Sequence, residues 1–298
     1  MMMTAYVNSI STGQEVDFMN IGIRMHDAAP GTLAQRAEFV KAQGFSCVHL
    51  ALSKMLGPDY MEPRMATPGL AAQVRKDLSG LDIAVLGCYL NLAHPDRNAY
   101  QDTVKRYQAH LMLARWMGAG VVGTETGNPN AEYRYDPEKS HTEDALSLFI
   151  DRVAPVVEIA EKTGAVLAIE PVYTHIVSTP RRARKVLDAI HSPALRIILD
   201  PVNLLHADNF GQREQVLDEA MDVLQDEIVI IHMKDCVLDG GAVRSMACGL
   251  GGMDYEKLLR FALERKPGIQ MTLEDTLPEN AEGARLHLER AAAALTRA

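Results

Sequence analysis

Short apolar runs alternate with longer helical segments along this chain, and this alternation limits its fold more than any other feature. Each run is too short for a helix and rich in Ile, Val and Leu, which suits parallel strands covered on both faces. Eight strands alternating with helices indicate right-handed strand–helix–strand units and a parallel sheet. The runs occupy residues 20–24, 46–52, 82–92, 120–124, 165–170, 195–200, 228–232 and 270–274.

The residues that border the helical segments support the same alternation. Segment 32–43 starts with a Thr, a residue type that caps helices, and Gly164 follows segment 143–163. Thr179 and Pro180 have the types expected at the cap and the first position of a further helix. The helical segments predicted in this way include 32–43, 143–163 and 281–297.

Eight such units in 298 residues match a (β/α)8 barrel, or TIM barrel. A doubly wound open sheet of the same α/β class is the alternative architecture. No composition break or Pro/Ser-rich linker divides the chain. The sequence therefore predicts a single-domain α/β barrel over residues 1–298.

Composition excludes several classes of partner. The formal net charge of −9 argues against nucleic acid, which attracts basic proteins. The four cysteines are far apart and form no Cys-x-x-Cys pair, which argues against a disulfide framework or a zinc ribbon. The sequence has neither the pattern of a signal peptide nor an apolar run of about 18 residues. We therefore expect a cytoplasmic protein that binds neither nucleic acid nor membranes.

The last four apolar runs each end in a residue that can bind a metal: Glu170, Asp200, His232 and Glu274. In a barrel, the carboxyl ends of the strands form one rim, and active sites lie there. Three carboxylates that close together repel one another, and a divalent cation would neutralise most of that charge. Each acid taken singly could instead cap a helix or face water, but the coherent set favours a metal site.

The ligand chemistry of this set narrows the choice of metal. Oxygen-rich ligation with one nitrogen favours Mn²⁺ or Mg²⁺, with Mn²⁺ preferred here, and also accepts Co²⁺ or Zn²⁺. Because no cysteine belongs to the set, a structural zinc site is not expected.

Four motifs carry a resemblance to a known family: LAIEP around Glu170, IILDPVNLL (197–205), IHMKD (231–235) and TLED (272–275). With these motifs in this order, the chain resembles the xylose isomerase-like barrels, the sugar (phosphate) isomerase and epimerase group that also holds endonuclease IV. The resemblance implies one metal held by the four strand-end residues and, as in the ketose epimerases, proton exchange by the two glutamates. It also implies that homo-oligomers can form.

The chain departs from the family in several places. Ketose epimerases often carry a His three residues after the metal Asp, where this chain has Asn203, and a second Glu where it has Ile176. The extra histidines that endonuclease IV needs for three metals would fall near Tyr89 and Glu125, and they are absent. A DNA-repair function is therefore not expected.

The predicted function is that of a metal-dependent sugar or sugar-phosphate isomerase or epimerase. A metal that chelates a carbonyl and its neighbouring hydroxyl stabilises an enediolate, and Glu170 and Glu274 could take and return the proton. A lyase of the inosose dehydratase type is the alternative, and a non-catalytic sugar-binding barrel is a third. The expected partner in each case is a small carbohydrate.

Further rim residues are candidates for substrate contacts, although loop packing, capping or solvent exposure would also explain them. Arg244, in the loop after the seventh strand, could bind phosphate. The polar segment 126–142 follows the fourth strand and has the length of an active-site lid. The candidates for substrate contacts are Asn91, His94, Glu125, His175, Asn203, His206, Lys234 and Arg244.

Overall fold

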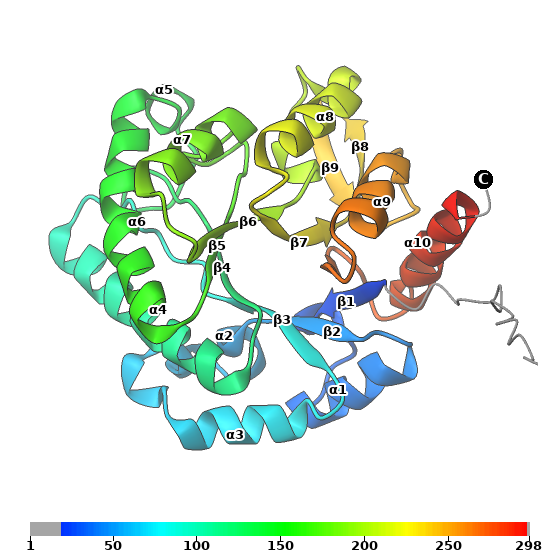
Figure 1. Ribbon diagram of the computed structural model, residues 1–298, viewed down its shortest axis with the longest axis horizontal. Helices are drawn as coiled ribbons and strands as arrows, with labels where there is room; N and C mark the ends of the chain where they lie inside the picture. The colour runs from blue at the N-terminus through cyan, green and yellow to red at the C-terminus, as the bar shows by residue number, and fades with distance from the viewer. Residues whose placement is uncertain (1–18, 297–298) are drawn as a thin grey trace, which may run out of the picture.

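The computed structural model describes residues 19–296 and contains a closed barrel of eight parallel strands (Figure 1). The strands follow one another around the barrel in the order β1-β10-β7-β6-β5-β4-β3-β2. Their bounds are β1 (Asn20–Arg24), β2 (Cys47–Leu50), β3 (Asp82–Gly87), β4 (Val121–Glu125), β5 (Leu167–Glu170), β6 (Leu195–Leu199), β7 (Ile228–Met233) and β10 (Gln270–Leu273). The barrel is the predicted architecture, and the open-sheet alternative is wrong.

Helices surround the strands and bury their outer faces (Figure 1). The largest apolar cluster joins side chains of the strands to side chains of these helices, as expected for strands covered on both faces. The helices are α1 (Leu33–Ala42), α2 (Leu52–Met55), α3 (Pro68–Asp77), α4 (Arg97–Met117), α5 (Pro137–Ser140), α6 (Glu143–Thr163), α7 (Pro180–Ile190), α8 (Arg213–Leu224), α9 (Glu256–Arg260) and α10 (Ala281–Leu295).

The barrel closes where β1 pairs with both β10 and β2. In register, Asn20 pairs with Gln270 and Gly22 pairs with Cys47. A Cβ atom added at Gly22 would lie 2.3 Å from the carbonyl oxygen of Cys47. Glycine at this position therefore permits the close approach of two neighbouring strands.

The predicted helix boundaries are confirmed. Thr32 forms a capping box with Gln35 at the start of α1. Gly164 adopts a left-handed conformation after α6, and Thr179 accepts a hydrogen bond at the start of α7, which has Pro180 at its first position. The last helix, predicted over 281–297, ends at Leu295, and residue 297 lies outside the described part of the chain.

Two elements differ from the prediction. The third strand was expected over 82–92 but ends at Gly87, because the backbone of Leu90 bonds instead to the hydroxyl of Tyr107. After β7, a hairpin of β8 (Asp235–Asp239) and β9 (Ala242–Met246) replaces the expected loop. Its turn consists of Gly240 and Gly241, both with positive φ, as a two-residue hairpin turn requires.

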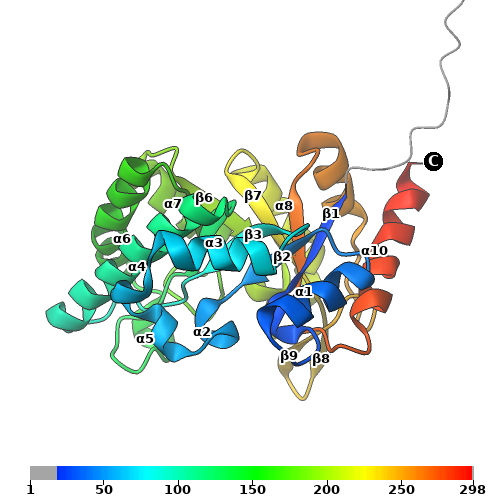
Figure 2. The same ribbon diagram turned by 90° about the horizontal axis from the view of Figure 1, so that it is seen from below.

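The connections that follow the strands gather at one end of the barrel. Helix α2 follows β2, α5 lies in the connection after β4, and the β8–β9 hairpin follows β7. All three lie along the lower edge of Figure 2, which is therefore the end where the carboxyl termini of the strands meet. Among the described residues, no helix combines the length and the apolar character needed to cross a membrane.

Candidate functional site

A cavity of about 410 Å³ opens among the carboxyl ends of the strands. This is the rim on which TIM-barrel enzymes place their active sites. Strands and connections from around the whole barrel contribute to its walls. The polar residues that line it are Arg24, His26, His49, Ser53, Lys54, Tyr89, Glu125, Glu170, Asn203, Lys234 and Glu274.

Two of the four predicted metal ligands, Glu170 and Glu274, line this cavity, and Asp200 and His232 are buried next to them. The Nδ1 atom of His232 lies 3.3 Å from Oε2 of Glu170 and 3.4 Å from Oε1 of Glu274. Two groups of buried side chains could each hold a metal ion, with donor atoms within 4.8 Å of one another. One group is Glu170, Asp200 and His232, and the other is His49, His232 and Glu274.

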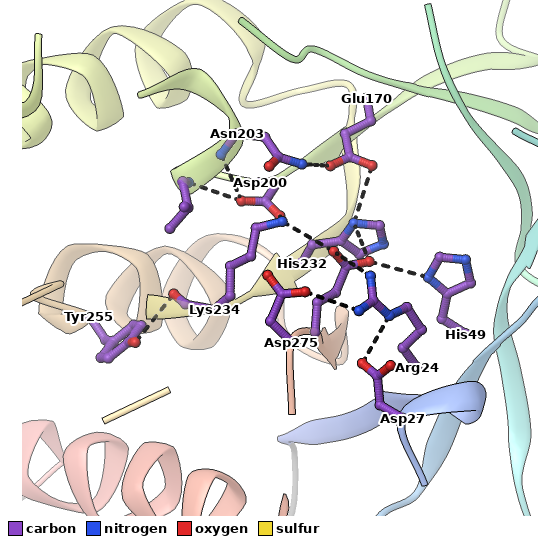
Figure 3. Close-up of polar contacts among 12 residues, drawn as sticks. Arg24, Asp27, His49, Glu170, Asp200, Asn203, His232, Lys234, Tyr255 and Asp275 are labelled. Atoms are coloured by element: carbon purple, nitrogen blue, oxygen red, sulfur yellow. Dashed lines mark hydrogen bonds and ion pairs between the residues drawn. The ribbon is translucent and has the colours of Figure 1, made fainter. Parts of the chain in front are cut away.

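Lys234 lies against two of these carboxylates and is 6% exposed (Figure 3). Its Nζ atom is 2.9 Å from Oδ2 of Asp200 and 3.2 Å from Oε2 of Glu274. Burial lowers the pKa of Lys234, but the carboxylates of Asp200 and Glu274 outweigh it and raise the pKa above the ordinary value. The three ionised carboxylates and this ammonium leave two negative charges, which a divalent cation would neutralise.

Asp200 owes its position to the turn that follows β6. Its Oδ1 atom accepts hydrogen bonds from the backbone N–H groups of Val202 and Asn203, at 2.9 and 3.1 Å. The side-chain amide of Asn203 donates in turn to Oε1 of Glu170. Burial raises the pKa of Asp200 to about 6, even though Lys234 opposes the rise. The turn thus fixes two of the predicted ligands relative to each other.

The donor set fits a divalent cation. Among the described residues, neither ring nitrogen of His232 has a hydrogen-bond partner, although the side chain is fully buried. Bonds of about 2.1 Å to an ion would place neighbouring donors roughly 3.0–3.4 Å apart, as Nδ1 of His232 lies from the two glutamates. These atoms could therefore bind an ion with little rearrangement.

The charges of the site act strongly on one another. Burial lowers the pKa of His232, but Glu274 and Glu170 outweigh it and raise the pKa to about 9. Burial raises the pKa of Glu274, but His232 and Lys234 outweigh it and hold the pKa well below its usual value. In the metal-free protein, a proton on His232 therefore takes part of the place of a cation.

Arg24 and His49 belong to the site, but the sequence analysis missed them. Arg24 contacts Glu274 at 3.6 Å and forms shorter ion pairs with Asp27 and Asp275 (Figure 3). Nδ1 of His49 lies 3.6 Å from Oε1 of Glu274. Arg24 is the last residue of β1, and His49 lies one residue before the end of β2. The rule that found the four predicted ligands finds neither, because Arg24 is a cation and His49 lies in the middle of the predicted run 46–52.

Glu125 and His175 lie together beside the cavity. The hydroxyl of Tyr133 donates to Oε2 of Glu125 at 3.1 Å, and Nε2 of His175 lies 3.7 Å from the same oxygen. The rings of Tyr133 and His175 stack at 5.4 Å. Burial, followed by the charge of Glu170, raises the pKa of Glu125 to about 7. Tyr133 belongs to the segment predicted as a lid, so this segment reaches the site.

Two of the predicted substrate contacts hold loops in place. The side-chain amide of Asn91 donates to the backbone carbonyls of Asn128 and Asn130, which anchors the connection after β4. Nδ1 of His94 accepts a hydrogen bond from the backbone of Asp96 at the start of α4. Neither side chain lines the cavity.

Two others lie away from the cavity. The ring of His206 stacks on Tyr173 at 3.9 Å and faces a separate small pocket. Arg244 lies on β9 with its side chain 71% exposed, and it pairs with Asp239 on the other strand of the hairpin. The structure therefore does not bring Arg244 to the cavity as a phosphate ligand, because the hairpin holds it in solvent.

Comparison with known proteins agrees with the barrel fold. The sequence profile described as "Xylose isomerase-like TIM barrel" matches residues 37–294. The chain belongs to the xylose isomerase-like TIM barrel family. No curated protein matches the chain.

Solved structures of xylose isomerase-like barrels share this fold at low sequence identity. The apo form of 3-keto-D-glucoside 4-epimerase from E. coli has a TM-score of 0.71 and 16% identity, over 91% of this chain and 99% of that one. L-ribulose 3-epimerase has a TM-score of 0.70 and 16% identity, over 94% and 96%. A family member from Mycobacterium smegmatis, solved in complex with magnesium, has a TM-score of 0.69 and 18% identity, over 95% and 100%.

Proposed function

We propose that this chain is a divalent-metal-dependent sugar isomerase or epimerase that works by proton transfer. One observation carries the proposal: carboxylates of Glu170 and Glu274 line the same cavity and both lie within 3.4 Å of one nitrogen of His232. Two carboxylates at one metal site are what proton removal and return next to a carbonyl require. Membership of the family and the fold shared with sugar epimerases support the same chemistry.

The residues that would hold the cation are Glu170, Asp200, His232 and Glu274. Three carboxylates and one imidazole favour Mn²⁺, and Mg²⁺, Co²⁺ or Zn²⁺ would also fit. When bound, the cation supplies Lewis-acid stabilisation of the negative charge that develops on the substrate oxygens.

The chain's own residues divide the remaining work. Glu170, which accepts a hydrogen bond from the amide of Asn203, would exchange a proton with a carbon atom of the bound sugar. Glu274 is kept ionised by His232 and Lys234, so it is available as the second proton-transfer group. Proton return to the same carbon gives an epimer, and return to the neighbouring carbon gives an aldose–ketose isomer.

Glu274→Gln tests this assignment. We expect turnover to fall by at least about 100-fold, because general acid–base catalysis contributes roughly 10²–10⁴-fold. The assay would incubate the metal-loaded protein with a panel of ketoses, aldoses and their phosphates in D₂O, and follow product formation and deuterium incorporation.

Glu282→Gln, an exposed glutamate on α10, is the matched control and should keep full activity. Wild-type turnover in the Glu274→Gln variant, measured on the same metal content, would refute the proton-transfer role.

A lyase is the second candidate, and Glu125 is the observation that favours it. Because its pKa is raised to about 7, a large fraction of this carboxyl carries a proton at neutral pH. A protonated carboxyl beside the cavity could donate to a departing hydroxyl, as a dehydratase requires. Product mass separates the two functions, because an isomerase conserves mass and a dehydratase product lacks one water.

A further inference from the structure

We propose that His49 is an additional metal ligand, so that this centre carries two imidazole nitrogens where the predicted set has one. The inference rests on the metal site of the proposed function and is independent of the sugar chemistry. It changes which ion the chain should select.

The side chain of His49 lies buried beside Glu274 and His232. It is 2% exposed, and neither of its ring nitrogens has a hydrogen-bond partner among the described residues. A buried imidazole without partners carries a free-energy cost that coordination of an ion would offset. Nδ1 of His49 lies 3.6 Å from Oε1 of Glu274, the same oxygen that lies 3.4 Å from His232. His49, His232 and Glu274 thus form one of the two groups with metal-ligand spacing.

The surrounding residues hold the ring of His49 in this place. The imidazole of His49 stacks on that of His232 at 5.2 Å, with 15° between their planes, and contacts the ring of Tyr89 at 5.6 Å. A Cβ atom added at Gly87 would lie 2.8 Å from Nε2 of His49. The glycine therefore leaves the space that the imidazole fills, and the two aromatic neighbours fix its orientation.

Asp200 belongs to the other group of possible ligands, which does not include His49. Its Oδ1 atom accepts two backbone hydrogen bonds, and its Oδ2 atom faces the ammonium of Lys234 at 2.9 Å. Lys234 therefore compensates the charge of Asp200 without a metal, although Oδ2 has no hydrogen-bond partner among the described residues. An ion that lies toward Glu274 would gain a nitrogen of His49 as a ligand in addition to the predicted set.

Two imidazoles alter the expected metal preference. Carboxylate oxygens suit Mg²⁺ and Mn²⁺, whereas imidazole nitrogens suit Co²⁺, Zn²⁺ and other later metals of the first row. We therefore expect this chain to bind Co²⁺ and Zn²⁺ more tightly than Mg²⁺ by a wider margin than a one-histidine site would.

The test compares the wild-type chain with His49→Ala by calorimetric titration of the metal-free protein with Co²⁺ and with Mg²⁺. Loss of His49 should weaken Co²⁺ binding by roughly 10-fold or more, which is at least the effect of removing an outer-shell partner. Mg²⁺ binding should change less. His26→Ala is the matched control, because His26 lines the same cavity but belongs to neither ligand group.

A second measurement uses only the wild-type chain, so it does not depend on whether a variant folds. Electron paramagnetic resonance of the wild-type chain loaded with one Cu²⁺ counts the coupled nitrogens directly, and the inference requires two. A single coupled nitrogen, or a His49→Ala variant that binds Co²⁺ as tightly as wild type, would overturn it in favour of a histidine that contacts only substrate. Because neither measurement uses a sugar, the result is read separately from the proposed activity.

Discussion

Lys234 shows how one residue changes the character of the whole site. Its ammonium lies between Asp200 and Glu274, where it lowers the mutual repulsion of the buried carboxylates. A buried ion pair of this kind adds little net stability over an apolar replacement of the whole pair, but loss of one member leaves a charge without compensation. We therefore regard Lys234 as a group that positions the carboxylates and limits their mutual repulsion in the metal-free barrel.

Lys234→Met is expected to destabilise the metal-free protein by about 3–5 kcal/mol, the cost of removing one member of a buried pair. Saturating Mn²⁺ should recover part of that loss, because the cation compensates the same carboxylates. Urea unfolding in chelator and in Mn²⁺ would measure both effects.

Lys105→Met is the control for this experiment. Lys105 also pairs with a carboxylate, Asp102, but both side chains are largely exposed, so loss of Lys105 should change stability far less than loss of Lys234. Equal effects of the two substitutions would contradict the role assigned to Lys234.

At the scale of elements, the contact between β1 and β2 depends on Gly22, which has no side chain. A Cβ atom at Gly22 would meet backbone atoms of Cys47, which cannot move without parting the strands. Gly22→Ala should therefore destabilise the barrel by several kcal/mol or prevent folding, as overpacking against a rigid neighbour does. Yield of folded protein and thermal unfolding are the measurements.

Gly283→Ala is the matched substitution for comparison. Gly283 lies inside α10, and nothing lies within 4 Å of the position its Cβ would take. Alanine should raise stability there by up to about 1 kcal/mol, since it is the better helix former. A Gly22→Ala variant as stable as Gly283→Ala would show that β1 and β2 do not approach as closely as described.

The elements themselves were largely predictable from sequence, and the exceptions have local causes. The alternation of strands and helices could be predicted from apolar runs and capping residues. Apolar runs are typical of buried strands, and capping residues bond to the free backbone groups at helix ends. The β8–β9 hairpin was missed although Gly240 and Gly241 form the turn pair that such hairpins favour. The early end of β3 could not be foreseen, because it depends on the hydroxyl of Tyr107, which lies on helix α4.

At the scale of the whole molecule, only those parts of the candidate site that follow from the geometry of the barrel could be predicted. The carboxyl ends of the strands meet on one rim, so four polar residues at the ends of four runs could be placed together from the sequence alone. The stacking of His49 on His232 and the reach of Lys234 across to Asp200 depend on side-chain packing between distant segments. Sequence patterns within one segment carry no information about such contacts.

Metal binding should stabilise the whole barrel, and more strongly as pH rises. His232 has a pKa of about 9 in the metal-free protein, so below that pH an ion must displace its proton. Between pH 6 and 8, the affinity for Mn²⁺ should therefore rise, by up to about 10-fold per pH unit or roughly 1.4 kcal/mol of added stability.

Protonated His232 also stabilises the metal-free protein at low pH, and this contribution is lost as pH rises toward 9. The rise in affinity and this loss reflect the same proton, so the gap in Tm between metal-loaded and metal-free protein widens once, as pH rises. Thermal unfolding with Mn²⁺ and with chelator at each pH, at matched ionic strength, measures this gap. A gap that stays constant or narrows from pH 6 to 8 would contradict the assignment of His232 as a ligand.

The pairing of β1 with β10 has a consequence for synthesis of the chain. Asn20 meets its partner Gln270 only after 250 further residues have left the ribosome, which takes roughly 10–50 s at common rates of translation. During that time the first strand has one neighbour instead of two, and its apolar side chains are exposed to other proteins. We therefore expect the pairing of the first and last strands to make the chain depend on chaperones during translation. We do not expect the same pairing to slow refolding of the finished chain.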